Sequence, residues 1–483
     1  MASRVVLTFV PIILLKNMKS KRLLKIADKH QIPELVEKKD DILRRIRHRT
    51  ILFHVLIFIP IIIFWATIIA SLERTPLTGR WRIILLSPEE EDEIAAQLAG
   101  PGWYRAVGEI LSAEGGPPNI IPPSDWRLQW VRDTLRRLES AIPTLARENE
   151  LCSHWVDCGP DDIPLPPPAE YPLRPRPRAS ETLRRFAEMT CARTCPPAPH
   201  AIAGPPYSLL VIDKPEASNA FSYGFGPDGG GGIVVFSGFI DDVLSRHQAP
   251  MSEPESQSWL SRLFGLGPRA PPHPIPTEEQ TAELATLLAH ELAHLVLSHH
   301  IETLSSGSIV WPSVLSIVTD AIRAFLFPVT MLFGPFINDA LAGVTKVGAG
   351  EFSQLSEFCT SQKQEVEADV VSARILAHAG FDPRDALRFW ENRHDTPKTA
   401  ECSPGRAEET VAAQSESLTR KWIGETHPVH EVRVQKLKAE LERWEAERQA
   451  ARARRDKERA AQREAAAAAA STDSAAVQDE QEP

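Results

Sequence analysis

The residues of this 483-residue chain that could do chemistry begin with His290, Glu291 and His294, which form a His-Glu-x-x-His pattern. The flanking run 281–300 (TAELATLLAHELAHLVLSHH) lacks Gly and Pro and is rich in Ala and Leu, so it is predicted to be a helix. Residues four apart share a helix face, so both imidazoles can bind one Zn²⁺ per chain. Glu291 can then take a proton from a water at that metal. The alternative is a core helix whose histidines merely line up.

A third protein ligand is expected from a second helix. The segment 361–379 (SQKQEVEADVVSARILAHA) is predicted to be that helix, and it carries Glu365 and Asp369 four residues apart. We expect Glu365 to bind the metal and Asp369 to orient a ligand histidine. Glu367 lies about 200° round the helix from Glu365, so we expect it to face solvent or the start of a neighbouring element. Alone, a Glu-x-x-x-Asp pair is usually an exposed helix face.

Further motifs lie on both sides of the first one. His299, the Glu-x-Glu-Ala-Asp of 365–369, and Thr426-His427-Pro428 with Arg433 follow it. ERTPLTGR at 73–80 with LSPEEE at 86–91, and Asn-Ala-Phe at 219–221 with IVVFSG at 233–238, precede it. In this order, over about residues 50–440, they resemble the Ste/HtpX-type membrane gluzincins, and within them the OMA-type mitochondrial metallopeptidases. The sequence departs from that pattern at Gln364, where a short basic run is common, and in longer stretches at 229–232, 245–276 and 395–418.

The resemblance implies a zinc metalloendopeptidase domain of mainly α-helical fold with a small β-sheet (α+β), placed behind one N-terminal transmembrane helix. It implies cleavage of membrane proteins in mitochondrial inner-membrane quality control. It also places His427 or Arg433 where either could stabilise the oxyanion of the reaction, although His427 could instead be structural in a helix cap. One alternative is another Ste/HtpX-like peptidase, in bacterial-type quality control or prenyl-protein processing. A non-catalytic zinc-stabilised scaffold is a second alternative, but such a protein would not need Glu291.

A membrane anchor is predicted at residues 51–71. The run 51–70 (ILFHVLIFIPIIIFWATIIA) has no charged residue, and at 1.5 Å per residue it would span about 30 Å, the thickness of a bilayer core. A buried core helix is the alternative. Residues 1–50 hold 13 Lys and Arg against 5 Asp and Glu, so the positive-inside rule places the catalytic part across the membrane from the N-terminus. With the resemblance, this predicts the mitochondrial inner membrane, with the catalytic domain facing the intermembrane space.

Composition divides the chain into four parts. They are a basic leader (1–50), the anchor (51–71), the peptidase domain (72–440, with Pro-rich insertions near 158–206 and 245–277) and a charged helix with a disordered tail (441–483). Strands are predicted at 207–212 and 233–236. The edge strand that the resemblance implies near 219–221 could pair with an extended substrate. The start of the leader is compatible with a signal or transit segment. The segment 309–350 is either a membrane-dipping hairpin or a buried helix pair.

Six cysteines are too few for a disulfide scaffold in a chain of this length. Cys152 with Cys158, and Cys191 with Cys195, could form bridges or stay free. A second zinc site is less favoured because neither spacing is Cys-x2-Cys. The net charge of −10 is unevenly spread, and the positive excess of residues 1–50 suggests targeting or orientation rather than nucleic acid as a partner. We expect a membrane-embedded protein that acts on protein substrates in or near the membrane, and the sequence leaves a homo-oligomer open.

Overall fold

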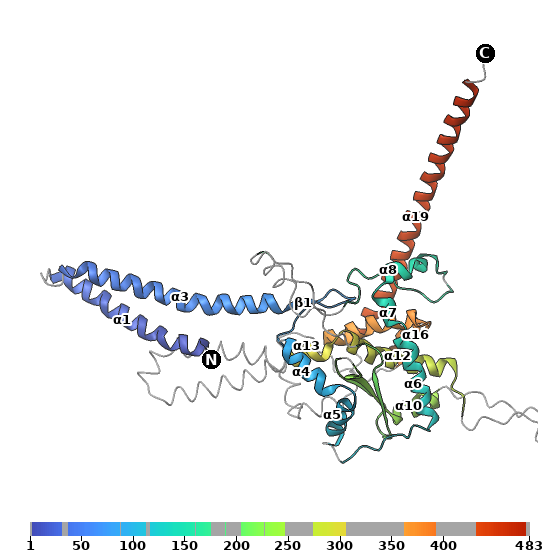
Figure 1. Ribbon diagram of the computed structural model, residues 1–483, viewed down its shortest axis with the longest axis horizontal. Coiled ribbons are helices and arrows are strands. Elements are labelled where there is room, and N and C mark those ends of the chain that lie inside the picture. Colours follow the sequence, from blue (N-terminus) through green and yellow to red (C-terminus); the bar gives the residue numbers. More distant parts are fainter. Residues whose placement is uncertain are drawn as a thin grey trace, which may run out of the picture.

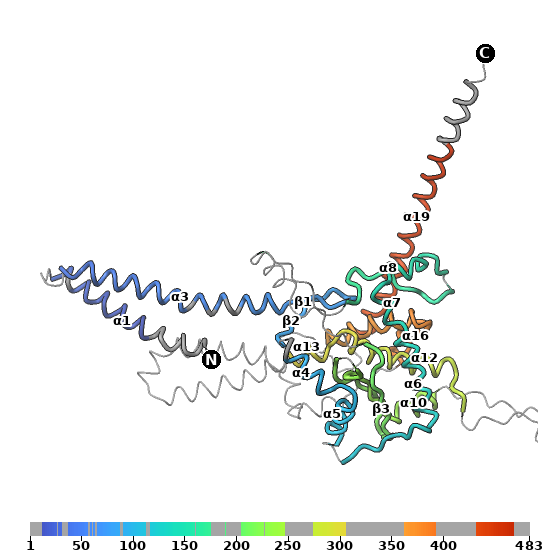
Figure 2. Tube along the Cα trace, in the orientation of Figure 1, coloured from blue at the N-terminus to red at the C-terminus, as the bar shows by residue number. Residues whose placement is uncertain are grey.

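The computed structural model describes residues 2–30, 37–86, 88–112, 116–159, 161–174, 189, 204–226, 228–246, 274–305, 362–392 and 431–479. A body of helices around a small sheet carries two long projections (Figure 1). One projection is a pair of N-terminal helices and the other is a single C-terminal helix, and they leave the body in different directions (Figure 2). The mainly helical fold with small sheets agrees with the sequence prediction.

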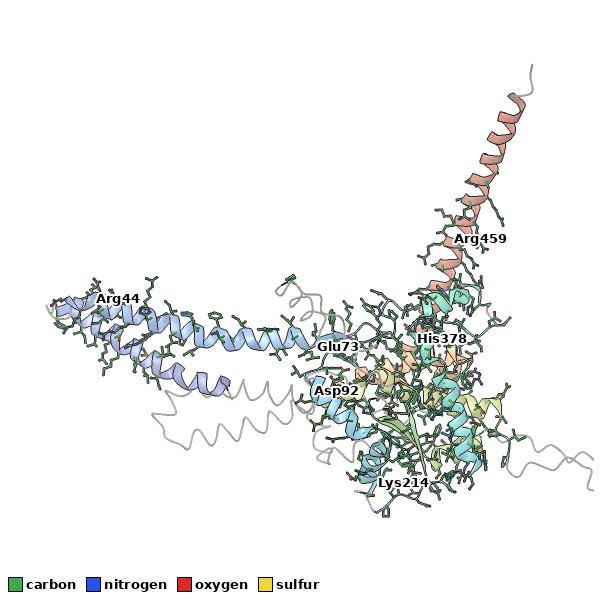
Figure 3. All side chains as sticks on the ribbon, viewed as in Figure 1. Arg44, Glu73, Asp92, Lys214, His378 and Arg459 are labelled. Atoms are coloured by element: carbon green, nitrogen blue, oxygen red, sulfur yellow. The ribbon has the colours of Figure 1, made fainter. Side chains whose placement is uncertain are left out.

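The N-terminal projection is an antiparallel pair of helices, α1 (Ala2–His30) and α3 (Lys39–Ser71). Asn17 Nδ2 donates to Thr50 Oγ1 at 3.2 Å, and Arg49 Nη1 donates to Ser20 Oγ at 3.1 Å. Residues 2–30 of the basic leader therefore form a helix that packs on α3, which contains the predicted anchor. Arg44 marks the outer part of this pair and Glu73 its junction with the body (Figure 3).

The predicted anchor lies within α3, where large apolar side chains such as Phe58, Ile62 and Trp65 are 54%, 62% and 57% exposed. Across the part of the chain that the structure describes, no helix is both long enough and apolar enough to cross a membrane. The membrane span at 51–71 therefore stays a prediction.

After α3 the chain forms a short hairpin of β1 (Leu72–Arg74) and β2 (Trp81–Ile83). Two helices follow, α4 (Pro88–Leu98) and α5 (Pro101–Ser112). Arg82 of β2 pairs with Glu73 at 2.7 Å and donates to the backbone carbonyl of Leu297. Because Arg82 is 3% exposed, these contacts hold the hairpin against the body.

Three strands form the central sheet in the order β3-β5-β4: β3 (Ser208–Ile212), β5 (Gly231–Phe236) and β4 (Ala220–Gly224). β5 is parallel to β3 and antiparallel to β4, so β4 lies at one edge of this sheet, where the resemblance implied an edge strand. Successive side chains of β5 alternate between two apolar clusters: Ile233 and Val235 join one, and Val234 and Phe236 join the other. Both faces of the sheet are therefore covered by helices.

Helix α5 covers one face of the sheet with Trp103, Val107 and Leu111. The other face is covered by α6 (Trp126–Glu139), α10 (Ser237–Arg246) and α12 (Glu278–Val296). Asp125 caps α6 through its side chain, and the separate short helix α7 (Ile142–Leu145) follows with Pro143 in its first turn. Next come α8 (Glu148–Leu151) and the 3₁₀ helix η1 (Ser153–Asp157).

After α12 the chain forms α13 (His299–Ser305), a helix over residues 362–378, α16 (Pro383–Asn392) and α19 (Glu431–Asp479). Leu437 and Trp444 of α19 join the same core as α12. The helix runs on to Asp479, into the segment predicted to be a disordered tail. Cys152 and Cys158 are free thiols.

Candidate metal centre

The first two ligand residues are presented by α12. A capping box, in which Thr277 accepts from the Gln280 amide and Gln280 accepts from the Thr277 amide, fixes the start of this helix. Leu288 and Leu292 are fully buried in the core, and this sets the rotation of the helix about its axis. His290 and His294 are likewise buried, with their Nε2 atoms 3.2 Å apart.

Glu365 completes the group from the helix over residues 362–378. Its Oε2 lies 3.2 Å from His290 Nε2, and its Oε1 lies 3.5 Å from His294 Nε2. The donor atoms of the three residues all lie within 4.8 Å of one another. Tetrahedral zinc with ligands at about 2.0–2.1 Å places neighbouring donor atoms roughly 3.4 Å apart. Two imidazoles and one carboxylate at these separations therefore fit Zn²⁺, and the sequence-predicted ligand set is brought together.

The second carboxylate predicted on that helix holds His290. Asp369 Oδ1 lies 2.9 Å from His290 Nδ1, on the side of the ring away from the other ligands. Burial disfavours the charged imidazole, but the carboxylates of Asp369 and Glu365 outweigh it and raise the pKa of His290. This negative surrounding favours a cation between the ligands.

Arg433 acts on the two carboxylates of the centre. Its Nε and Nη2 donate to Asp369 at 2.7 and 2.8 Å, and its Nη1 lies 3.1 Å from Glu365 Oε2. Burial raises the pKa of Asp369, but the guanidinium charge outweighs it and the pKa falls below its ordinary value. Arg433 is 3% exposed, so it lies where it can hold both acids in position.

Glu291 is fully buried on α12, between the two ligand histidines in sequence. This is the position that the His-Glu-x-x-His pattern requires of a general base. His427, the other candidate catalytic residue, lies outside the described residues, as do the segment 309–350 and Cys191 and Cys195.

The sequence model of peptidase family M48 matches residues 186–441, slightly more than half of the chain. This range contains all three metal ligands. The chain belongs to peptidase family M48. A comparison with the curated proteins gives no match. With its ligand group intact, this M48 peptidase is a zinc metalloendopeptidase that uses Zn²⁺. When bound, zinc lowers the pKa of a water molecule and polarises the scissile carbonyl.

Sequence reasoning missed one cluster of this M48 peptidase. Glu367 does not face solvent, because it is 6% exposed and contacts His299 and Arg80. The sequence had left solvent or a neighbouring element open for this side chain, and the structure shows the neighbouring element. Burial raises the pKa of Glu367, but hydrogen bonds from His299 and Arg80 outweigh it and bring the pKa down to about 2. Glu302, which also binds Arg80, belongs to the same cluster. No spacing rule connects Arg80 with a helix nearly 300 residues later, although the segment 73–80 had stood out by resemblance.

Proposed function

We propose that this M48 zinc peptidase is anchored to a membrane by its N-terminal helices and cleaves proteins in or near that membrane, as an OMA-type enzyme of mitochondrial inner-membrane quality control. The observation that carries the proposal is the apolar surface of α3. Between residues 51 and 69, the large apolar side chains that are at least 42% exposed are Ile51, Leu52, Val55, Phe58, Ile59, Ile61, Ile62, Trp65 and Ile69. Soluble proteins rarely expose an apolar patch of this extent, and a lipid environment would cover it.

The orientation of the anchor follows from charge. Arg44, Arg45, Arg47 and Arg49 lie directly before the apolar run. The positive-inside rule assigns this end to the matrix side, so the metal centre belongs in the intermembrane space.

In the proposed reaction Glu291 takes the proton of the attacking water and passes it to the leaving amine. His290, His294 and Glu365 hold the metal, and Asp369 fixes the His290 ring through the 2.9 Å contact at Nδ1. In this reading Arg433 keeps the two acids oriented without touching the substrate.

Substrate would be held in extended form by the edge strand β4. This strand packs against α12, and Ser222 Oγ lies 3.4 Å from His300 Nε2, just beyond the ligand helix. A polypeptide that added to this edge would run alongside the helix that carries the zinc ligands. The backbone would supply the binding contacts, which suits an endopeptidase with broad sequence tolerance.

The first experiment separates chemistry from metal binding. Purified protein is expected to hold about one zinc per chain, and casein cleavage by Glu291→Gln is expected to fall by about 10²–10⁴-fold while zinc content is unchanged. His294→Ala is expected to lose both zinc and cleavage. Near-normal cleavage by Glu291→Gln would instead favour a different base or the scaffold reading.

The second experiment tests the membrane arrangement. Protease added to mitoplasts is expected to digest the chain after Arg80, whereas intact mitochondria should protect it. Protection in mitoplasts would place the metal centre in the matrix and reverse the proposed orientation. Extraction of the protein by carbonate would remove the anchor itself from the proposal.

A further inference from the structure

We propose that His299, Glu367 and Arg80 form a positioning relay that holds the zinc ligand His294 and ties it to the turn between β1 and β2. The relay rests on the metal centre and is independent of the proposed membrane role. It consists of three buried or half-buried side chains from three separate segments of the chain. Each contacts the next within 3.3 Å.

The inner end of the relay is a contact between two histidines. His299 Nδ1 lies 2.9 Å from His294 Nδ1, and the two rings meet edge to face with centroids 4.9 Å apart. If His294 binds zinc through Nε2, its Nδ1 must carry a proton. The His294 Nδ1–H then donates a hydrogen bond to His299 Nδ1. His299 must in turn carry its own proton on Nε2, and that atom lies 3.3 Å from Glu367 Oε2. One assignment of protons therefore satisfies every contact.

A break in the helix creates this contact. On an uninterrupted helix, His299 would point about 140° away from His294. Instead α12 ends at Val296, and Ser298 takes a φ of 56°, a conformation that residues other than glycine rarely adopt. The turn swings His299 back against the ligand. An unusual backbone geometry at this place is what a positioning role would require.

The outer end of the relay lies on the β1–β2 turn. Glu367 Oε2 lies 2.7 Å from Arg80 Nη2, and Glu367 Oε1 accepts a hydrogen bond from the Thr78 hydroxyl. Arg80 also donates both Nη1 and Nη2 to Glu302, each at 2.7 Å. The guanidinium therefore bridges two buried carboxylates, of which only Glu367 touches His299.

The two ligand histidines are thus supported in parallel ways from opposite ends of the chain. His290 is backed by Asp369 and then Arg433, near the C-terminal end of the peptidase part. Arg80, in the turn between β1 and β2, supports His294 through the relay. The ligand set is fully oriented only when this N-terminal turn is docked, so the segment after α3 is part of the metal centre.

The test compares two carboxylates that bind the same arginine. Glu367→Gln is expected to raise the zinc dissociation constant by about 10–100-fold, the usual effect of losing a partner behind a ligand histidine. It is also expected to change the visible absorption of the Co²⁺-substituted protein. Glu302→Gln removes a comparable ion pair without touching His299, so its zinc affinity is expected to stay within about threefold of the wild type.

A milder variant guards against simple misfolding. Thr78→Val is nearly isosteric and removes only the hydroxyl that donates to Glu367. Zinc binding a few-fold weaker, with unchanged thermal stability, is the expected result. Equal loss of zinc affinity in Glu367→Gln and Glu302→Gln would mean that the cluster acts only on stability. Wild-type affinity in both Thr78→Val and Glu367→Gln would refute the relay.

Discussion

Replacing Arg433 by Gln is expected to remove the strongest electrostatic support of the metal centre. The guanidinium is 3% exposed and makes contacts of 2.7 and 2.8 Å to Asp369 and of 3.1 Å to Glu365. Without it, two buried carboxylates on one helix face lose their shared cation. Removing one partner of a buried ion pair costs about 3–5 kcal/mol, because the remaining charge is left uncompensated.

Urea unfolding of the zinc-free protein can measure this loss in free energy of unfolding. A chelator is present so that the metal's own charge cannot offset the carboxylates. For a slope of about 3 kcal/mol per molar urea, a loss of about 4 kcal/mol lowers the midpoint by roughly 1.3 M. Arg433→Lys keeps the charge but loses the planar fork, so an intermediate shift is expected.

The matched control is Arg388→Gln on the neighbouring helix α16. Arg388 pairs with Asp385, but its side chain is 67% exposed. Surface pairs of this kind contribute about 0–1 kcal/mol, so the midpoint should move little. If Arg433→Gln unfolded at the same urea concentration as the control, the buried carboxylates would not depend on Arg433, and the role assigned to it here would be wrong.

Three further predictions concern the body. Burial raises the pKa of Glu148, but a histidine hydrogen bond and the charge of Arg374 outweigh it and lower the pKa below its ordinary 4.5. We therefore expect Glu148→Gln to lower the free energy of unfolding of the zinc-free protein by its full amount above about pH 4.5. The difference between the two proteins should shrink as pH falls below that value, and a difference independent of pH would contradict this. Burial raises the pKa of the Cys152 thiol, which is 4% exposed, so mass spectrometry should find it alkylated more slowly than Cys158 at pH 8. Leu288→Ala should lower the free energy of unfolding by about 2–5 kcal/mol, because Leu288 is fully buried; a loss under 1 kcal/mol would mean that the site refills.

The sequence by itself determined the parts of this protein that depend on local spacing. A helix places residues four apart on one face, so His290 and His294 could be paired without any structure, and a second helix with its own four-residue spacing offered Glu365 and Asp369. The strands at 207–212 and 233–236 were likewise predicted from their apolar, β-branched residues. These inferences needed only the periodicity of one element at a time.

Only the tertiary structure decided which distant residues support those ligands. The surroundings of Glu367 were ambiguous because helical geometry gives the direction of its side chain but not what that side chain meets. In the structure it meets Arg80. The contact of His299 with His294 could not be predicted from the sequence, because the helix breaks at Ser298 and a serine does not by itself predict a φ of 56°. Arg433 was placed near the centre by resemblance, but only the structure shows its ion pair with Asp369. Contacts between segments that are hundreds of residues apart depend on how whole elements pack, and no local pattern records that packing.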